Sequence, residues 1–151
     1  MFRGTTSSNL DSKGRLTIPS RYRDELELRC AGKMVVSIDF TDPCLSLYPL
    51  SEWEKIEAKL LQLPSLRADT RRLSRLLIGS AVDVELDANC RILIPSRLRE
   101  HAQITKEVTL VGQLNRFQLW SAECWDAVWT EDLQSLGGEN DLSSELLELV
   151  L

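Results

Sequence analysis

Short runs of β-branched and apolar residues alternate along the chain with polar segments that favour turns. Residues 16–18 and 92–94 are two such runs, and each follows a turn-like stretch in which Asp precedes other polar or small residues. Residues 33–38 and 106–111 are rich in Val, Ile and Leu, and residues 45–48 alternate as a half-buried strand does. Strands favour β-branched residues and place successive side chains on opposite faces, so each segment is predicted to be a strand.

Helical signals follow the strands. A Pro-Ser pair at residues 19–20 and another at residues 95–96 open short helices, because the first helical turn does not need the N–H that proline lacks and serine can cap free amides. Ser51 with Glu54 forms a capping box for a longer helix, and Ser121 starts its counterpart. The residues expected to face the core at helical spacing are Trp53, Ile56, Leu60 and Leu63 in the first, and Trp125, Val128, Trp129 and Leu133 in the second.

The chain contains an internal duplication. The phrase LDSKGRLTIPSRYR at residues 10–23 returns as LDANCRILIPSRLR at residues 86–99, a shift of 76. A second block, LSLYPLSEW at residues 45–53, aligns with FQLWSAECW at residues 117–125, a shift of 72. Two copies are too few for a solenoid. The duplication therefore predicts a pseudo-twofold pair, built like a symmetric dimer within one chain.

These elements divide the chain into four parts. Residues 1–63 form the first repeat with its helix, 64–79 a linker helix, 80–136 the second repeat with its helix, and 137–151 an acidic tail. The tail either forms a short amphipathic helix or stays mobile. The exposed face of the linker helix carries Arg67, Arg71, Arg72 and Arg75. Such charge is typical of a solvated face, and a subunit contact or a phosphate track is the alternative.

The charge is unevenly distributed. The net charge is −5, but residues 131–151 hold six acidic side chains and no Lys or Arg, which leaves the other 130 residues with 18 − 17 = +1. Residues 1–33 carry seven basic and four acidic side chains, a local +3. Fields between exposed charges act over about 10 Å at physiological salt. The local charge of a surface, rather than the net charge of the chain, therefore determines which partners that surface attracts. The distribution permits an anionic partner.

Several function classes find no support in the sequence. Four cysteines without a C-x-x-C pair and a single histidine argue against a disulfide framework and a zinc site. No Gly-rich phosphate loop and no nucleophile with a histidine partner is present. The N-terminus lacks a secretory signal, and no apolar stretch is long enough to cross a bilayer. We therefore expect a cytoplasmic protein that is not an enzyme, with no metal, cofactor, small-molecule substrate or membrane partner.

The D-x-x-x-R segment at Asp11–Arg15 carries the most suggestive chemistry. Asp, Ser, Lys and Gly favour a tight turn in which Asp11 accepts hydrogen bonds from loop amides and Gly14 takes a positive φ without steric cost. Lys13 and Arg15 would then project from a rigid tip. Lysine is a point charge suited to phosphate, and arginine is a planar fork that matches the guanine edge. The alternative is an ordinary turn in which Asp11 and Arg15 simply pair, and the spacing alone favours this alternative.

The second copy of this loop has changed. Asn89 replaces Lys13 and Cys90 replaces Gly14, so the copy loses one positive charge and gains a side chain that a positive φ would strain. Either the second loop takes a different shape or it no longer needs to reach an anionic partner. We infer a division of labour in which the first loop binds and the second mainly completes the fold or meets a neighbouring subunit, although Arg91 is retained. On the short helices we expect ion pairs of Arg21, Arg23, Arg97 and Arg99 with Asp24, Glu25 or Glu100.

The opening MFRG, the duplicated phrase with its D-x-x-x-R signature at Asp11–Arg15 and Asp87–Arg91, and the stretch YPLSEW resemble the MraZ family over nearly the full length. The resemblance implies a transcriptional regulator related to the AbrB and SpoVT DNA-binding modules. It also implies a mainly β fold with short helices (α+β), in which two tandem swapped-hairpin repeats form a pseudo-twofold β-barrel flanked by helices.

The resemblance further implies a ring-shaped homo-oligomer on the bacterial nucleoid that represses the division and cell-wall gene cluster by binding direct repeats in its own promoter. The residues expected to contact DNA are Lys13 and Arg15, with smaller contributions from Arg3 and Arg91, and those expected to shape the loops are Asp11, Gly14 and Asp87. The rival interpretation is an oligomeric scaffold without direct DNA readout, which binds another protein through its acidic tail or arginine-bearing linker helix.

Overall fold

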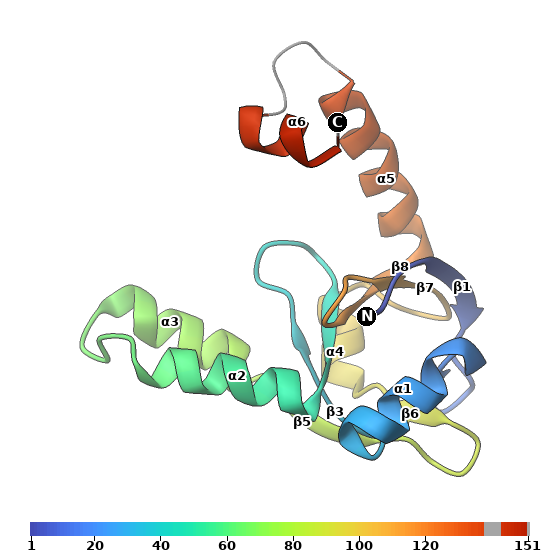
Figure 1. Ribbon diagram of the computed structural model, residues 1–151. Helices are drawn as coiled ribbons and strands as arrows, with labels where there is room; N and C mark the ends of the chain where they lie inside the picture. The colour runs from blue at the N-terminus through green and yellow to red at the C-terminus, as the bar shows by residue number, and fades with distance from the viewer. Residues whose placement is uncertain (138–142, 151) are drawn as a thin grey trace.

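The computed structural model describes residues 1–137 and 143–150 (Figure 1). Residues 138–142 and 151, which belong to the predicted acidic tail, lie outside the described part. In chain order the elements are β1 (Thr5–Asn9), β2 (Arg15–Thr17), α1 (Ser20–Cys30), β3 (Lys33–Ile38), β4 (Leu45–Pro49), α2 (Leu50–Leu61), α3 (Ala68–Leu77), β5 (Val82–Glu85), β6 (Arg91–Leu93), α4 (Ser96–His101), β7 (Glu107–Gly112), β8 (Phe117–Ser121), α5 (Ala122–Leu136) and α6 (Ser144–Val150).

The main sheet follows the duplication. Its six strands run in the order β1-β7-β8-β4-β3-β5, and every neighbouring pair is antiparallel. Reading this order from either end meets equivalent strands of the two repeats, so the predicted pseudo-twofold passes between β4 and β8. The first strand of each repeat pairs with the other repeat, β1 with β7 and β5 with β3. The repeats are therefore swapped, and the expected α+β fold with tandem swapped repeats is confirmed.

The expected closed barrel is wrong. The six-stranded sheet stays open, with β1 and β5 at its edges. Among the described residues, β2 and β6 pair with each other rather than with the edge strands, and they form a separate two-stranded ribbon in which Leu16 lies opposite Ile92. Because β2 and β6 satisfy each other's backbone groups, they are not available to join the two edges of the large sheet.

The ribbon covers one face of the sheet. Leu16 and Ile92 are buried in a large core that also receives side chains from α1, α4 and alternate positions of the sheet strands. Met34 and Val36 of β3 point into this core, whereas Val35 between them points to the opposite face. This alternation is the period of two that the sequence indicated for the strands.

Helical arms cover the opposite face. Trp53 of α2 packs on Tyr48, and α3 closes over the same cluster with Ile78, which directly follows it. Trp125 of α5 packs on Trp120 of β8 with ring centroids 5.8 Å apart. Figure 1 shows α2 with α3, and α5 with α6, leaving the sheet as two arms that extend in different directions. α3 lies within residues 64–79, the segment predicted to be a linker helix, and α6 lies within the segment predicted to be the acidic tail.

Three of the residues expected to face the core are exposed instead. Trp129, Leu133 and Leu63 have 54%, 57% and 45% of their surfaces exposed, respectively. Trp129 and Leu133 lie beyond the point where α5 leaves the sheet, so they keep the helical spacing of a core stripe but have no partner layer within the described chain. Helical periodicity identifies an apolar face without saying whether that face packs inside the same molecule.

The helices begin near the predicted residues, but the predicted side-chain caps are not always present. Ser121 caps α5 by accepting a hydrogen bond from the Cys124 amide at 3.1 Å. The predicted capping box at Ser51 is wrong, because α2 already begins at Leu50 with Pro49 in the cap position and no side-chain cap bond. Proline likewise occupies the cap position of α1 and α4 without a serine cap. Proline sets the entry φ of these helices, and their first amides do without a side-chain acceptor.

The four cysteines are free thiols in the structure. Cys44 is buried, and Cys30, Cys90 and Cys124 are half-buried. Burial raises the pKa of the Cys44 thiol and keeps it protonated. Helices in the described part of the chain lack the length and apolarity needed to traverse a membrane.

Candidate nucleic-acid interface

The first loop is built around the carboxylate of Asp11. Its Oδ1 accepts hydrogen bonds from the amides of Lys13 at 3.0 Å and Arg15 at 2.9 Å, and its carbonyl accepts from the Gly14 amide at 3.0 Å. Gly14 has a φ of 84°, a conformation that glycine adopts without a Cβ clash. The predicted loop-shaping roles of Asp11 and Gly14 agree with this geometry, and Lys13 is exposed at the tip.

Arg15 folds back onto the same carboxylate. Its Nε donates to Asp11 Oδ2 at 2.6 Å, so the side chain is half-buried rather than projecting freely as expected. The Arg15 amide, aided by the Arg15 guanidinium, lowers the pKa of Asp11 to about 2, and the carboxylate is charged at neutral pH. A guanidinium has five N–H donors. The bond to Asp11 therefore orients the Arg15 fork and leaves the N–H groups of its terminal nitrogens for other acceptors.

The second loop repeats this geometry. Asp87 Oδ1 accepts from the amides of Asn89 at 2.8 Å and Arg91 at 2.9 Å, and Arg91 Nε donates to Asp87 Oδ2 at 3.0 Å. Hydrogen bonding from the Arg91 amide lowers the pKa of Asp87. Cys90, in the place of glycine, has a φ of 57°. The alternative in which the second loop takes a different shape is wrong, and the conformation expected to strain Cys90 is present.

The difference between Gly14 in the first loop and Cys90 in the second predicts opposite effects on stability for two variants, each of which places one loop's residue in the other loop. Cys90→Gly should raise the free energy of unfolding by about 0.5–1 kcal/mol, because relief of the left-handed conformation outweighs the added chain entropy of glycine. Gly14→Cys should lower it by about 1–2 kcal/mol, since a Cβ there would lie 2.8 Å from Arg99 Cζ. Urea unfolding at one protein concentration measures both. A Cys90→Gly variant no more stable than the parent would contradict the strain.

The ribbon brings the two loops onto one surface. Leu16 and Ile92 point into the core, so the neighbouring positions Arg15 and Arg91 point outward on the same face. Arg91 also reaches across the ribbon, with its NH1 nitrogen 3.8 Å from Asp11 Oδ2. The Asp11 carboxylate thus lies within ion-pair distance of guanidinium groups from both repeats. Of the residues predicted to contact DNA, Lys13, Arg15 and Arg91 are brought together.

Arg3 is not brought to this surface. It precedes β1, whereas the first loop follows β1, and the intervening strand runs along the edge of the sheet. Its carbonyl accepts a hydrogen bond from the Tyr22 hydroxyl, which anchors the N-terminus to α1. The position of Arg3 supports an anchoring role for its backbone.

Two arginines that the sequence had assigned to ion pairs support the ribbon instead. Arg23 Nε donates to the Ile18 carbonyl and Arg99 Nε to the Ile94 carbonyl, both at 3.0 Å. Arg21 bonds to Thr6. Within the described residues, the expected ion pairs of these arginines with Asp24, Glu25 or Glu100 do not form, so that prediction is wrong. The duplicated ending IPSR-x-R was the signal for this matched role.

Sequence comparison places this architecture among known proteins. A model of the MraZ protein family, described as antitoxin-like, matches residues 1–76 and again residues 77–146. The chain belongs to the MraZ family. MraZ relatives from Pseudomonas aeruginosa, Pseudomonas putida and Pseudomonas entomophila are 60%, 57% and 56% identical to it over 151 residues, the full length of both chains in each pair. Each of these relatives is named "Transcriptional regulator MraZ".

The two MraZ matches coincide with the structural repeat. The boundary between them falls at the C-terminal end of α3. Each MraZ unit therefore contains one D-x-x-x-R loop, one ribbon strand and one helical arm. The two units differ at the loop tip, where Lys13 faces solvent in the first and Asn89 in the second.

Proposed function

We propose that the chain is a sequence-specific DNA-binding transcriptional regulator and that the β2–β6 ribbon is its reading element. The observation that carries the proposal is the outward pair of Arg15 and Arg91, held by Asp11 and Asp87 respectively on a ribbon whose other side is anchored in the core. The names of the Pseudomonas relatives support the same function.

The dimensions of the ribbon suit duplex DNA. Its three residue pairs span about 10 Å at ~3.4 Å per residue. The major groove of B-DNA is about 12 Å wide and admits a two-stranded ribbon. Within the groove, an oriented guanidinium can bond in bidentate fashion to guanine O6 and N7. The core packing of Leu16 and Ile92 limits the entropy lost when such a ribbon binds.

The two loops contribute unequally in this proposal. Lys13 sits at the tip of the first loop, where a mobile ammonium can bind a phosphate beside the groove. Asn89 at the second tip can offer hydrogen bonds but no charge. The first loop therefore supplies a backbone anchor together with base readout through Arg15, and the second contributes mainly through Arg91.

One ribbon makes few contacts, so the proposal includes assembly. In a ring-shaped homo-oligomer, neighbouring ribbons engage successive direct repeats, and each contact after the first is effectively intramolecular. We propose that this assembly, located on the nucleoid, occupies direct repeats in its own promoter and represses the division and cell-wall gene cluster downstream. Occupancy of those repeats would block RNA polymerase.

A nuclease footprint on DNA from upstream of the protein's own gene tests this function. Protection should appear at evenly spaced direct repeats and should disappear when the repeats are scrambled at constant base composition. Protection that ignores the scrambling would exclude sequence-specific reading. A complete lack of protection would favour the scaffold interpretation.

Salt dependence tests the electrostatic part. If Lys13 from several subunits contacts phosphates, log affinity should fall steeply with log salt, and Lys13→Asn should make the slope shallower by about one unit per engaged subunit. Fluorescence anisotropy across a salt series measures the slope. The matched control is Asn89→Lys, which adds the same charge at the second tip and should change the slope less. A flat response in the parent protein would contradict phosphate anchoring.

A further inference from the structure

The two helical arms carry opposite charge. Just before and within α3, four arginines (Arg67, Arg71, Arg72 and Arg75) accompany one acid, Asp69, whereas α2 holds two lysines and three glutamates, so residues 50–77 carry a net charge of +2. We call α2 with α3 the basic arm. In the described residues of α5 and α6, by contrast, there are six acidic side chains and no Lys or Arg. We call α5 with α6 the acidic arm. In the pseudo-twofold the two arms are equivalent, so their charge is a clear departure from internal symmetry.

The basic arm has an open groove. Between α2 and α3 lies a cleft of about 490 Å³ whose apolar lining includes Leu60, Leu61 and Leu63. Arg71 and Arg75, one helical turn apart on α3, line the same cleft together with one acid, Glu57 of α2, so its charged lining is net positive. Leu61 is 86% exposed, so an apolar surface bordered by positive charge is left uncovered in the single chain.

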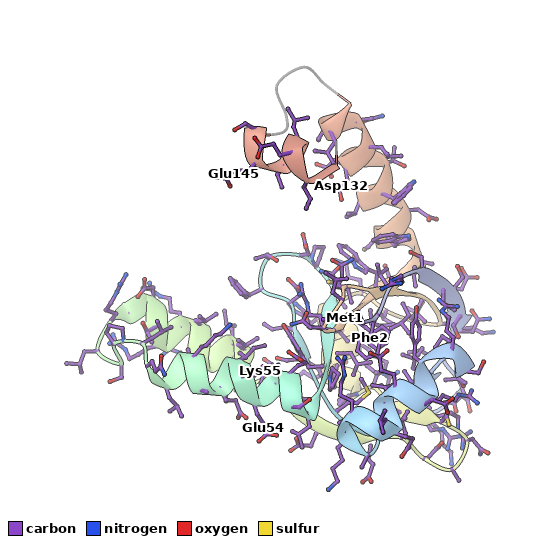
Figure 2. The ribbon with its side chains drawn as sticks, viewed as in Figure 1. Met1, Phe2, Glu54, Lys55, Asp132 and Glu145 are labelled. Carbon is purple, nitrogen blue, oxygen red and sulfur yellow. The ribbon has the colours of Figure 1, made fainter. Side chains whose placement is uncertain are left out.

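The acidic arm has the complementary composition. Trp125, Trp129, Leu133 and Leu136 recur along one face of α5, and Asp132 falls within that face. The stripe is continuous with the core at its start, because the Trp125 and Trp129 rings lie with centroids 5.9 Å apart, and it is exposed from Trp129 onward. Figure 2 shows Asp132 on α5 and Glu145 on α6, on the arm that projects away from Lys55 of α2.

These two surfaces do not cover each other within one chain. The arms leave the sheet in different directions (Figure 1), and in the described part of the molecule no packed interface joins α3 to α5 or α6. Both arms rest on the sheet face opposite the β2–β6 ribbon. A partner bound to either arm would therefore leave the proposed reading surface accessible.

We propose that the acidic arm of one copy docks into the groove of the basic arm of a second copy, with the α5 stripe against Leu60, Leu61 and Leu63 and the acids beside Arg71 and Arg75. This inference rests on the oligomer in the proposed function and assigns its interface. The two docking surfaces differ, so the contact is head-to-tail, and repetition of such a contact closes a ring when the rotation per copy permits. Burial of the apolar stripe stabilises the contact, and the charges set its partner and register.

Charge reversal in the full-length chain tests this interface. Variant A carries Arg71→Glu and Arg75→Glu, and variant B carries Asp132→Arg and Glu145→Arg. Each variant alone should self-associate at least ~10-fold more weakly, because like charges then face each other across the contact. An equimolar mixture of A and B should recover the parent size, and so should a chain that carries all four changes. Sedimentation velocity measures the sizes.

Matched controls and separate outcomes keep the test decisive. Lys55→Glu on α2 and Glu131→Arg on the opposite side of α5 reverse charge outside the proposed contact and should leave the parent size unchanged. Circular dichroism confirms that A and B are folded. If A and B keep the parent size, or if their mixture does not recover the parent size, the interface is refuted. The nuclease footprint then still tests DNA binding independently. A parent protein that is monomeric at all concentrations would refute the interface and the ring together.

Discussion

Replacing Arg15 with alanine is expected to abolish sequence-specific promoter binding and to leave the assembly intact. A bidentate arginine contact provides about 1–3 kcal/mol of discrimination at a base pair, or roughly 10- to 100-fold. In the proposed oligomer the loss recurs at every engaged subunit, so the total effect on a multivalent complex exceeds the effect at one site. Gel-shift titration measures the affinity, and size-exclusion chromatography measures the assembly.

The loop should survive this change. Asp11 keeps its bonds to the backbone amides of Lys13 and residue 15 when the guanidinium is removed. Arg91→Ala provides the matched comparison, because Arg91 holds the equivalent position in the second repeat and should produce a smaller loss. Promoter binding by Arg15→Ala equal to that of the parent would refute the assignment of Arg15.

Replacing Phe2 with alanine is expected to lower the free energy of unfolding by about 3–5 kcal/mol. Phe2 is fully buried and stacks on Phe117 of the second repeat at 4.3 Å between ring centroids. It also meets the edge of the Tyr22 ring at 5.8 Å. The residue therefore joins the N-terminus, α1 and β8, and its removal would leave a large cavity where the swapped repeats meet.

Chemical denaturation at constant protein concentration measures this effect. Leu28→Ala is the control, since Leu28 on α1 is 92% exposed and its truncation should change stability by no more than about 0.5 kcal/mol. A loss below about 1 kcal/mol in Phe2→Ala would contradict the packing described at this position.

Local pattern predicted the segments that form β2, β3, β4, β6 and β7, and it did not single out β1, β5 or β8. The runs that became β2, β3, β4, β6 and β7 contain β-branched or apolar residues at positions that the core needs. β1 has the sequence TTSSN, without an apolar residue, and it forms because its backbone pairs with β7 of the other repeat. β5, with the sequence VDVE, alternates and could have been found.

The candidate site was predictable in its parts but not in its arrangement. The tight turn around Asp11 follows from local residue chemistry, because each hydrogen bond spans at most four residues. The approach of Arg91 to the same carboxylate depends on β2 pairing with β6, which brings together segments 76 residues apart. The exposed Trp129 stripe shows the corresponding limit for helices, since periodicity cannot distinguish a core face from a docking face.

A crystal structure of the protein bound to a duplex that contains the proposed direct repeats decides whether the β2–β6 ribbon reads DNA. We expect the ribbon within the major groove, with Arg15 hydrogen-bonded to base edges and Lys13 beside a phosphate. A complex in which the ribbon points away from the duplex, or in which another surface contacts the bases, would contradict this expectation.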